Sequence, residues 1–133
     1  MLLGQQVVQI GPKNRILVPK KFREELGEEL IVAYGYEGAL IVFSKKAWEE
    51  EVARSISGPL TQKSVREEAR FLLSGAEEIE LDEQGRFVLP VHLKRYAEIK
   101  DEVYFVGLGR WVEIWDSKKW EIQSKSFLGR RKS

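Results

Sequence analysis

Two arginines follow short turns at equivalent places in this chain of 133 residues, and they are its strongest candidates for chemistry. Arg86 follows the turn Asp82-Glu-Gln-Gly85, and Arg15 follows Gly11-Pro-Lys-Asn14, 71 residues earlier. An Asp that opens a turn accepts hydrogen bonds from backbone N–H groups, while Gly and Asn tolerate positive φ. The turns should therefore fix the direction of both arginines. Paired guanidinium groups suit phosphates or guanine edges.

A turn-closing ion pair between Asp82 and Arg86 is the competing interpretation of this motif. The first turn retains Arg15 although Gly11 stands where the second turn has Asp82. A purely structural ion pair should be lost together with its acidic partner. Retention of the arginine therefore favours contact with a ligand.

Charge is distributed unevenly, although the formal net charge is only +1. Residues 1–23 hold five basic residues and no acidic one, and residues 122–133 hold four basic residues and no acidic one. The segment 24–121 holds 13 basic and 21 acidic residues. Two basic ends around an acidic body hint at a polyanionic partner, although charge alone favours a merely solvated surface with a basic tail.

Composition disfavours several other kinds of site. The chain has no Cys, which excludes disulfides, thiol catalysis and thiolate metal ligands and is compatible with a reducing cytoplasm. Its single His, His92, disfavours zinc and Ser-His chemistry, and we expect it on a helix surface. No apolar run reaches membrane-spanning length. We therefore expect no metal, no cofactor and no membrane association.

One carboxylate pair gives an enzymatic alternative. Glu80 and Asp82 lie on one face of a strand by their period-two spacing, so that one pKa could be raised as in an acid/base dyad. No recognisable set of partner residues surrounds them. We expect a protein that is not an enzyme, without catalytic residues or a small-molecule substrate.

An internal repeat supplies the elements that must position the arginines. The sequence Arg15-Ile-Leu-Val-Pro19 aligns with Arg86-Phe-Val-Leu-Pro90 at a shift of 71, and Trp48-Glu aligns with Trp120-Glu at a shift of 72. Each half predicts two strands around the turn, a helix after the proline, a hairpin and a final helix. The segment between the halves predicts a packed helix with a capping box from Ser64 to Glu67.

The expected fold class is mainly β with short helices, built from duplicated β-β-α-β-β units. A unit of about 50 residues cannot close a good core alone, so the two should share a barrel. The expected boundaries are 1–56 for the first repeat, 57–74 for the linker, 75–121 for the second repeat and 122–133 for a basic tail. Apolar residues that look surplus to so small a barrel predict an oligomer: Leu2, Leu3, Val42, Trp115 and Trp120.

Several spaced motifs resemble the MraZ family. They are Leu3-Gly4, Phe22-Arg23, Leu72-Leu-Ser-Gly-Ala76, Asp82-x-x-Gly85-Arg86 with Pro90, and Glu113-Ile-Trp-Asp116-x-x-x-Trp120. The resemblance runs from residue 1 to about residue 121. It implies an AbrB-like double-split β-barrel with swapped hairpins. It also implies a cytoplasmic, nucleoid-associated transcriptional regulator.

The resemblance further implies a partner and a site. Members of the family bind double-stranded DNA with tandem repeats, upstream of the division and cell-wall gene cluster, as ring-shaped homo-oligomers. Their turn arginines contact the DNA. The expected DNA-binding residues are Arg15, Arg86, Lys13, Lys20, Lys21 and Arg23, and the expected turn-shaping residues are Asp82, Gly85 and Asn14. The first turn departs from the family pattern, because Gly11 and Asn14 replace the usual Asp and Gly. The alternative function is an antitoxin-like protein–protein interaction module.

Overall fold

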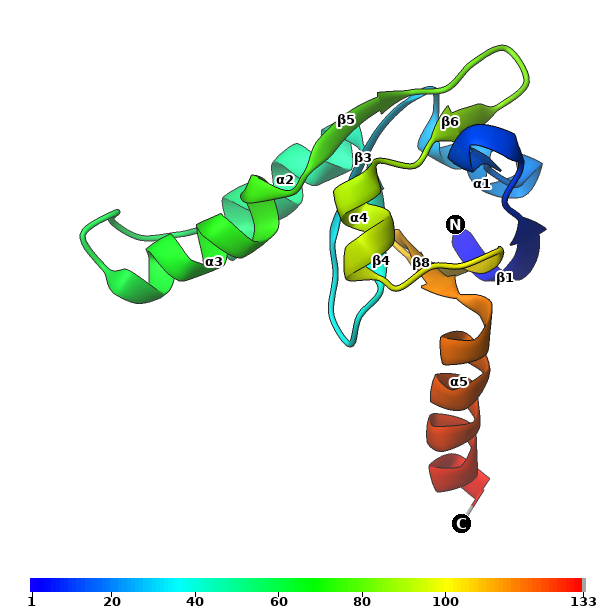
Figure 1. Cartoon of the computed structure of the whole chain (residues 1–133). Helices are drawn as coiled ribbons and strands as arrows, with labels where there is room; N and C mark the ends of the chain where they lie inside the picture. The colour runs from blue at the N-terminus through cyan, green and yellow to red at the C-terminus, as the bar shows by residue number, and fades with distance from the viewer. Residues whose placement is uncertain (133) are drawn as a thin grey trace.

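The computed structural model describes residues 1–132, whose eight strands form two antiparallel sheets (Figure 1). One is an open six-stranded sheet in the order β1-β7-β8-β4-β3-β5, and the other is a ribbon of β2 and β6. The strands of the first half are β1 (Leu2–Gln9), β2 (Arg15–Leu17), β3 (Glu29–Tyr34) and β4 (Leu40–Ser44). Those of the second half are β5 (Glu77–Glu80), β6 (Arg86–Val88), β7 (Glu102–Gly109) and β8 (Val112–Asp116).

The two halves exchange strands. In the six-stranded sheet β1 of the first half pairs with β7 of the second, and β5 of the second half pairs with β3 of the first. The ribbon likewise takes one strand from each half. If each strand is exchanged for its equivalent in the other half, the strand order of the sheet is simply reversed. The order is therefore symmetric about the middle of the sheet. This exchange places the two arginine-bearing strands side by side.

Helices border the sheets at several places (Figure 1). The short helices α1 (Lys20–Leu26) and α4 (Val91–Tyr96) each begin directly after a proline, Pro19 or Pro90, as the sequence predicts. The remaining helices are α2 (Lys45–Ser55), α3 (Lys63–Ser74) and α5 (Ser117–Lys132), together with the 3-10 turn η1 (Pro12–Asn14). The predicted class, mainly β with several short helices, is confirmed. None of the helices in residues 1–132 is both long enough and apolar enough to span a membrane.

The predicted capping box of the linker helix is wrong. Helix α3 begins at Lys63, one residue before Ser64, and its N-cap is Gln62, whose side chain makes no capping hydrogen bond. Glu67 instead forms an ion pair with Lys63, 3.7 Å away, one helical turn earlier. By contrast, the Ser44 hydroxyl caps α2 by accepting a hydrogen bond from the Ala47 N–H at 3.2 Å.

Most of the apolar residues expected at a subunit contact lie in the core. Leu2 and Val42 belong to the largest hydrophobic cluster, and Trp115 and Trp120 belong to a smaller one under α5. Each of these four is at most 7% exposed, whereas Leu3 is 61% exposed. These tryptophans are buried because Trp120 packs on Trp115 and Phe127, with ring centroids 5.6 and 5.9 Å apart. The apolar surplus seen in the sequence is therefore used mainly within one chain.

His92 does not lie on an exposed helix surface as expected. His92 is partly buried, where its Nε2 lies 2.9 Å from the Gly75 carbonyl oxygen and its ring meets Tyr34 edge-on. It is thus a packing residue between α4 and the end of α3.

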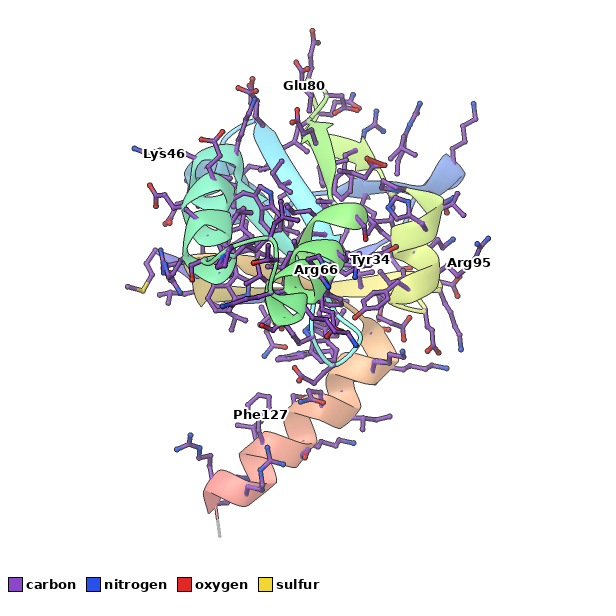
Figure 2. All side chains as sticks on the ribbon, turned by 90° about the vertical axis from the view of Figure 1, so that its left-hand side faces the viewer. Tyr34, Lys46, Arg66, Glu80, Arg95 and Phe127 are labelled. Atoms are coloured by element: carbon purple, nitrogen blue, oxygen red, sulfur yellow. The ribbon has the colours of Figure 1, made fainter. Side chains whose placement is uncertain are left out.

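The basic residues after position 121 continue α5 as far as Lys132, and this helix projects away from the sheet (Figures 1 and 2).

Candidate nucleic-acid interface

The ribbon of β2 and β6 places both turn arginines on one face. In its register Ile16 lies opposite Phe87, and both side chains are buried beneath the ribbon. Side chains alternate along a strand, so the flanking positions all face outward. These outward residues are Arg15 opposite Val88 and Leu17 opposite Arg86. The outer face of the ribbon thus carries two guanidinium groups on a diagonal and two exposed apolar side chains.

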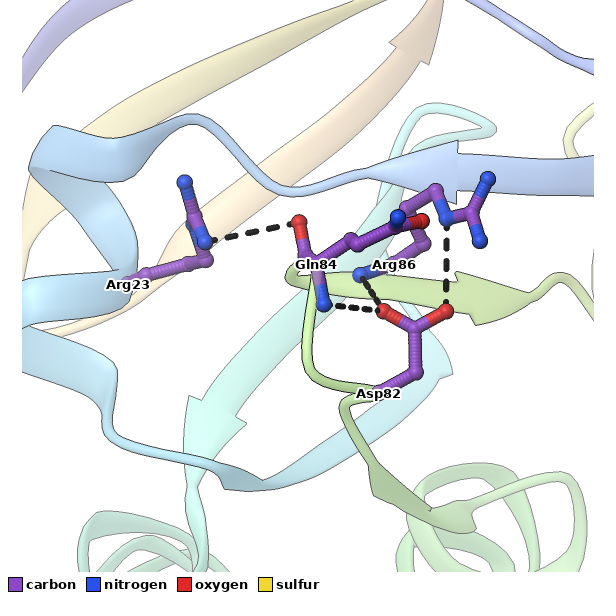
Figure 3. Close-up of polar contacts among 4 residues, drawn as sticks. All are labelled: Arg23, Asp82, Gln84 and Arg86. Atoms are coloured by element: carbon purple, nitrogen blue, oxygen red, sulfur yellow. Dashed lines mark hydrogen bonds and ion pairs between the residues drawn. The ribbon is translucent and has the colours of Figure 1, made fainter.

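The second turn holds Arg86 through Asp82 (Figure 3). Asp82 Oδ1 accepts hydrogen bonds from the backbone N–H groups of Gln84 and Arg86, each at 2.9 Å. Asp82 Oδ2 accepts a third from Arg86 Nε at 3.2 Å. The Arg86 backbone bond, with help from Gln84 and the guanidinium charge, holds the pKa of Asp82 below its usual 3.8. Asp82 therefore stays ionised and directs Arg86 near neutral pH.

Gly85 is needed in this turn for two reasons. Its φ is +79°, in the left-handed region that favours glycine. A Cβ at this position would also lie only 2.2 Å from Arg23 Nη1. Arg23 reaches from α1 to the turn, where its Nη1 lies 3.5 Å from the Gln84 carbonyl oxygen (Figure 3). The helix of the first half therefore packs on the turn of the second.

The first turn reaches a related shape by other means. Its closing bond, from Gly11 N–H to the Arg15 carbonyl at 2.8 Å, matches the bond from Asp82 N–H to the Arg86 carbonyl at 3.0 Å. Lys13 and Asn14 both adopt a φ of 60°, so Asn14 takes the left-handed place of Gly85. The Asn14 side chain accepts a hydrogen bond from Lys94 Nζ at 2.7 Å. The first turn is thus held by a residue of α4.

Backbone hydrogen bonds tie each turn to the opposite strand. The Gly85 carbonyl accepts a bond from Val18 N–H at 3.0 Å, and the Asn14 carbonyl accepts one from Leu89 N–H at 2.9 Å. These two bonds are equivalent under the repeat. They fix the two turns relative to each other. The backbone positions of the two arginines that follow the turns are therefore fixed as well.

The other expected basic residues divide into two groups. Lys13 is exposed at the first turn, next to the ribbon. Lys20 and Arg23 line a cavity of about 300 Å³ beside Asp82 and Gly85. Lys21 instead turns toward Gly4 of β1, with its Nζ 5.0 Å from the centroid of the Phe22 ring. The structure thus brings all of the expected residues except Lys21 to the ribbon and its turns.

Comparison with known proteins agrees with this duplicated arrangement. The family described as "MraZ protein, putative antitoxin-like" matches residues 1–71 and again residues 72–130. The chain belongs to the MraZ family. It is 43% identical over 126 residues to the "Transcriptional regulator MraZ" of Caldanaerobacter subterraneus subsp. tengcongensis, covering 95% of this chain and 88% of that protein. It is 40% identical over 124 residues to the protein of the same name from Acetivibrio thermocellus, covering 93% and 87%.

A structural comparison adds little to the MraZ assignment. The solution structure of PHS018 from Pyrococcus horikoshii aligns over 86% of this chain and 88% of that chain, at 18% identity. Its TM-score of 0.34 is too low to indicate a shared fold. The curated MraZ relatives are named as transcriptional regulators and not as enzymes.

In this MraZ chain the structure adds three residues to the set predicted from sequence. Lys94 supports the first turn, and the shift of 71 from Arg23 leads directly to it. Leu17 and Val88 remain 43% and 54% exposed on the arginine-bearing face. Their period-two spacing from Arg15 and Arg86 is the signal that could have identified them.

Proposed function

We propose that this chain is a sequence-specific DNA-binding transcriptional regulator whose outer ribbon face, with Arg15 and Arg86, contacts the major groove. The observation that carries the proposal is the diagonal placement of two guanidinium groups on a two-stranded ribbon. The major groove admits such a ribbon, and arginine is the commonest reader of guanine edges. Lys13, Lys20 and Arg23 would add phosphate contacts at the turns.

The exposed apolar side chains favour base recognition over phosphate binding alone. Leu17 and Val88 lie between the two arginines. Phosphate neutralisation requires cationic groups and makes no use of aliphatic ones. In the major groove, however, they can contact thymine methyl groups. The mixed face therefore suits a defined sequence that contains both guanine and thymine.

The proposal extends to fold and assembly. The exchanged strands and the separate ribbon support an AbrB-like double-split β-barrel, with repeats at 1–56 and 75–121, a linker at 57–74 and a basic tail at 122–133. We propose a homo-oligomeric ring that meets tandem DNA repeats upstream of the division and cell-wall gene cluster, in the cytoplasm at the nucleoid. The sheet supports assembly because it is open at both edges, and Leu3 and Val7 are exposed on the β1 edge.

A mobility-shift titration with the DNA upstream of the chain's own gene tests this function. We expect specific binding that exceeds binding to a scrambled sequence by at least two orders of magnitude at the same salt concentration. Equal affinity for the two DNAs would contradict sequence-specific regulation. The steepness of the salt dependence reports how many phosphates are contacted.

The family is described as antitoxin-like, which supports one alternative function, a protein–protein interaction module. An antitoxin-like module would bind another protein through α5, where Ile122 and Leu128 are 72% and 53% exposed. Deleting residues 122–133 separates the two functions. We expect the full and the shortened chain to show the same sequence preference for DNA, whereas a full chain without DNA selectivity that loses a protein partner on shortening would favour the alternative.

A further inference from the structure

We propose that a cavity between α2 and the β7–β8 turn binds an alkyl cation. None of the residues that line this cavity belongs to the ribbon. The expected ligand carries a guanidinium or primary ammonium group on a short aliphatic chain. The residues that argue for it are Phe43, Trp111, Leu72, Glu51, Glu113 and Arg110, all of which line the cavity. The proposal does not depend on DNA binding.

The size and walls of the cavity suit a ligand no larger than a side chain. Its volume is about 190 Å³, below the roughly 300–1,000 Å³ of sites for drug-sized ligands. Ile41, Phe43 and Leu72 supply apolar walls, and each is almost fully buried. An aliphatic stem would replace water along these walls, as the stems of lysine and arginine do on protein surfaces.

Aromatic rings form one side of the cavity. Phe43 and Trp111 stack with ring centroids 6.1 Å apart and planes 17° apart. The Arg110 guanidinium already lies over the Trp111 ring, 5.7 Å from its centroid, at the cavity rim. The indole face therefore has a geometry that accepts a planar cation, which aromatic rings attract through their quadrupole.

A carboxylate without a cationic partner faces the same space. Glu113 Oε1 accepts a hydrogen bond from Trp115 Nε1 at 2.7 Å, and within residues 1–132 no basic nitrogen lies within 4 Å of its carboxylate. Burial raises the pKa of Glu113 and the charge of Glu37 adds to this, while hydrogen bonding to Trp115 and Trp111 lowers the pKa in part. A bound cation would offset the remaining cost of the charge. Glu113 is thus the group with the most to gain from occupancy.

The second carboxylate is already engaged at the rim. Glu51 Oε1 lies 3.6 Å from Arg110 Nη1 and 4.0 Å from Arg54 Nη1, and its Oε2 accepts a hydrogen bond from the Ser55 hydroxyl at 2.7 Å. Arg110 is 57% exposed and lies over the Trp111 ring. In this position it would compete with a cationic ligand for the aromatic face, so its removal should leave binding unchanged or strengthen it.

Calorimetric titration of the full chain with butylguanidinium tests the proposal. Butylurea, which has nearly the same shape and no charge, is the matched ligand. We expect butylguanidinium to bind and butylurea to bind at least tenfold more weakly. Glu113→Gln, which keeps an acceptor for Trp115, should weaken butylguanidinium at least tenfold. Glu50→Gln removes the same charge from the exposed face of α2 and should have no effect.

Arg110→Ala should bind butylguanidinium equally or up to several-fold more tightly. Equal binding of butylurea, or unchanged affinity in Glu113→Gln, would overturn the proposal. Thermal melts of each variant show whether it is folded. DNA affinity, measured in parallel, shows whether the ribbon still functions, so failure of the cavity and failure of the DNA interface are distinguished.

A second titration identifies the source of the cation. Helix α5 ends in Arg131 and Lys132 and projects away from the body of its own chain (Figure 1). A peptide of residues 125–132 that binds more tightly than butylguanidinium, with the same loss in Glu113→Gln, would assign the cation to another copy of this chain. Equal or weaker peptide binding would assign it to a free amine or guanidine.

Discussion

At the scale of single residues, the two turn arginines differ in how far their side chains are fixed. Asp82 holds Arg86 through its backbone and its Nε, so this side chain is partly ordered before any ligand arrives. The first turn has Gly11 in place of the aspartate, and Arg15 is exposed. Ordering a side chain on binding costs conformational entropy. Arg86 should therefore contribute more to affinity than Arg15.

Replacement of Arg86 by alanine tests this difference. We expect Arg86→Ala to weaken specific DNA binding by about 1–3 kcal/mol per engaged site if the side chain reads a base edge. Arg15→Ala should cause a smaller loss, and both melting temperatures should change little. Lys46→Ala, which removes an exposed charge from α2 (Figure 2), is the control and should bind normally. Unfolding of Arg86→Ala would show that the arginine is structural.

Gly85→Ala should disturb the same turn through the backbone. The added methyl group must adopt a φ near +79° and would collide with Arg23. Such strain costs about 1–3 kcal/mol, and we expect a loss of that size in chemical denaturation together with weaker DNA binding. Asn14→Gly is the counterpart in the first turn, where glycine relieves strain but removes the contact with Lys94. Its stability should stay within about 1 kcal/mol of the wild type, and equal losses in the two variants would contradict this account.

The partly buried Glu113 carboxylate predicts a pH dependence of stability. The pKa of Glu113 is raised in the folded chain, so the folded state holds this proton more tightly than the unfolded state. Stability from this group is therefore lost as the pH rises from the ordinary glutamate value of about 4.3 through the raised pKa. Glu113→Gln should remove this part of the pH profile and be more stable than the wild type at pH 7. A variant less stable at pH 7 would show that the charge is favourable in the apo chain.

At the scale of elements, the short strands and helices of the repeat follow closely from local signals. Pro19 and Pro90 start α1 and α4, and Gly27 follows the last residue of α1. Asn14 takes positive φ as its residue type indicates. The linker helix differs, because Ser64 lies one residue inside α3. A local capping pattern is weak evidence where several residues can start the helix. Leu72, near the other end of α3, packs against residues of β3 and β4.

The attachment of helix α5 to the sheet depends mainly on Trp120. Trp120 packs against Trp115, Tyr104 and Phe127, and its Nε1 donates a hydrogen bond to Gln5 Oε1 of β1 at 2.7 Å. We expect Trp120→Ala to lower the free energy of unfolding by about 3–5 kcal/mol. The last turns of α5 should also lose protection in hydrogen exchange. A loss below about 1 kcal/mol would show that α5 is only loosely attached.

At the scale of the whole molecule, assembly should decide DNA affinity. One ribbon face offers few contacts, so a single site should bind weakly. In a ring the second contact becomes intramolecular, with an expected gain of roughly 10²-fold or more when the spacing fits. Inserting about half a helical turn between two repeats should abolish that gain. Light scattering at micromolar concentration checks the assembly, and a monomer, or equal affinity at both spacings, would contradict the ring.

Local sequence patterns did not predict which strands of the two halves pair with each other. The repeat predicted two similar units, but nothing in either unit indicated that β1 would pair with β7 and β5 with β3. Leu2 is buried on the exchanged strand β1, whereas Val42 is buried in β4 between β3 and β8. The exposed apolar surface was therefore overestimated from the sequence. The two arginines could be chosen as candidates from sequence because each lies next to a turn. The position of Leu17 and Val88 on the same face required the register of the ribbon.

The strand exchange also means that β1 remains unpaired for most of the synthesis of the chain. Gln9 of β1 hydrogen-bonds to Glu102 of β7, 93 residues later in the chain. At translation rates of about 5–20 residues per second, β1 waits roughly 5–20 s for its partner strand. The segment 1–12 carries no charged side chain during that delay. An uncharged strand with open hydrogen bonds is prone to pair with other nascent chains, so β1 is the segment of the emerging polypeptide that a chaperone would most need to shield until β7 leaves the ribosome.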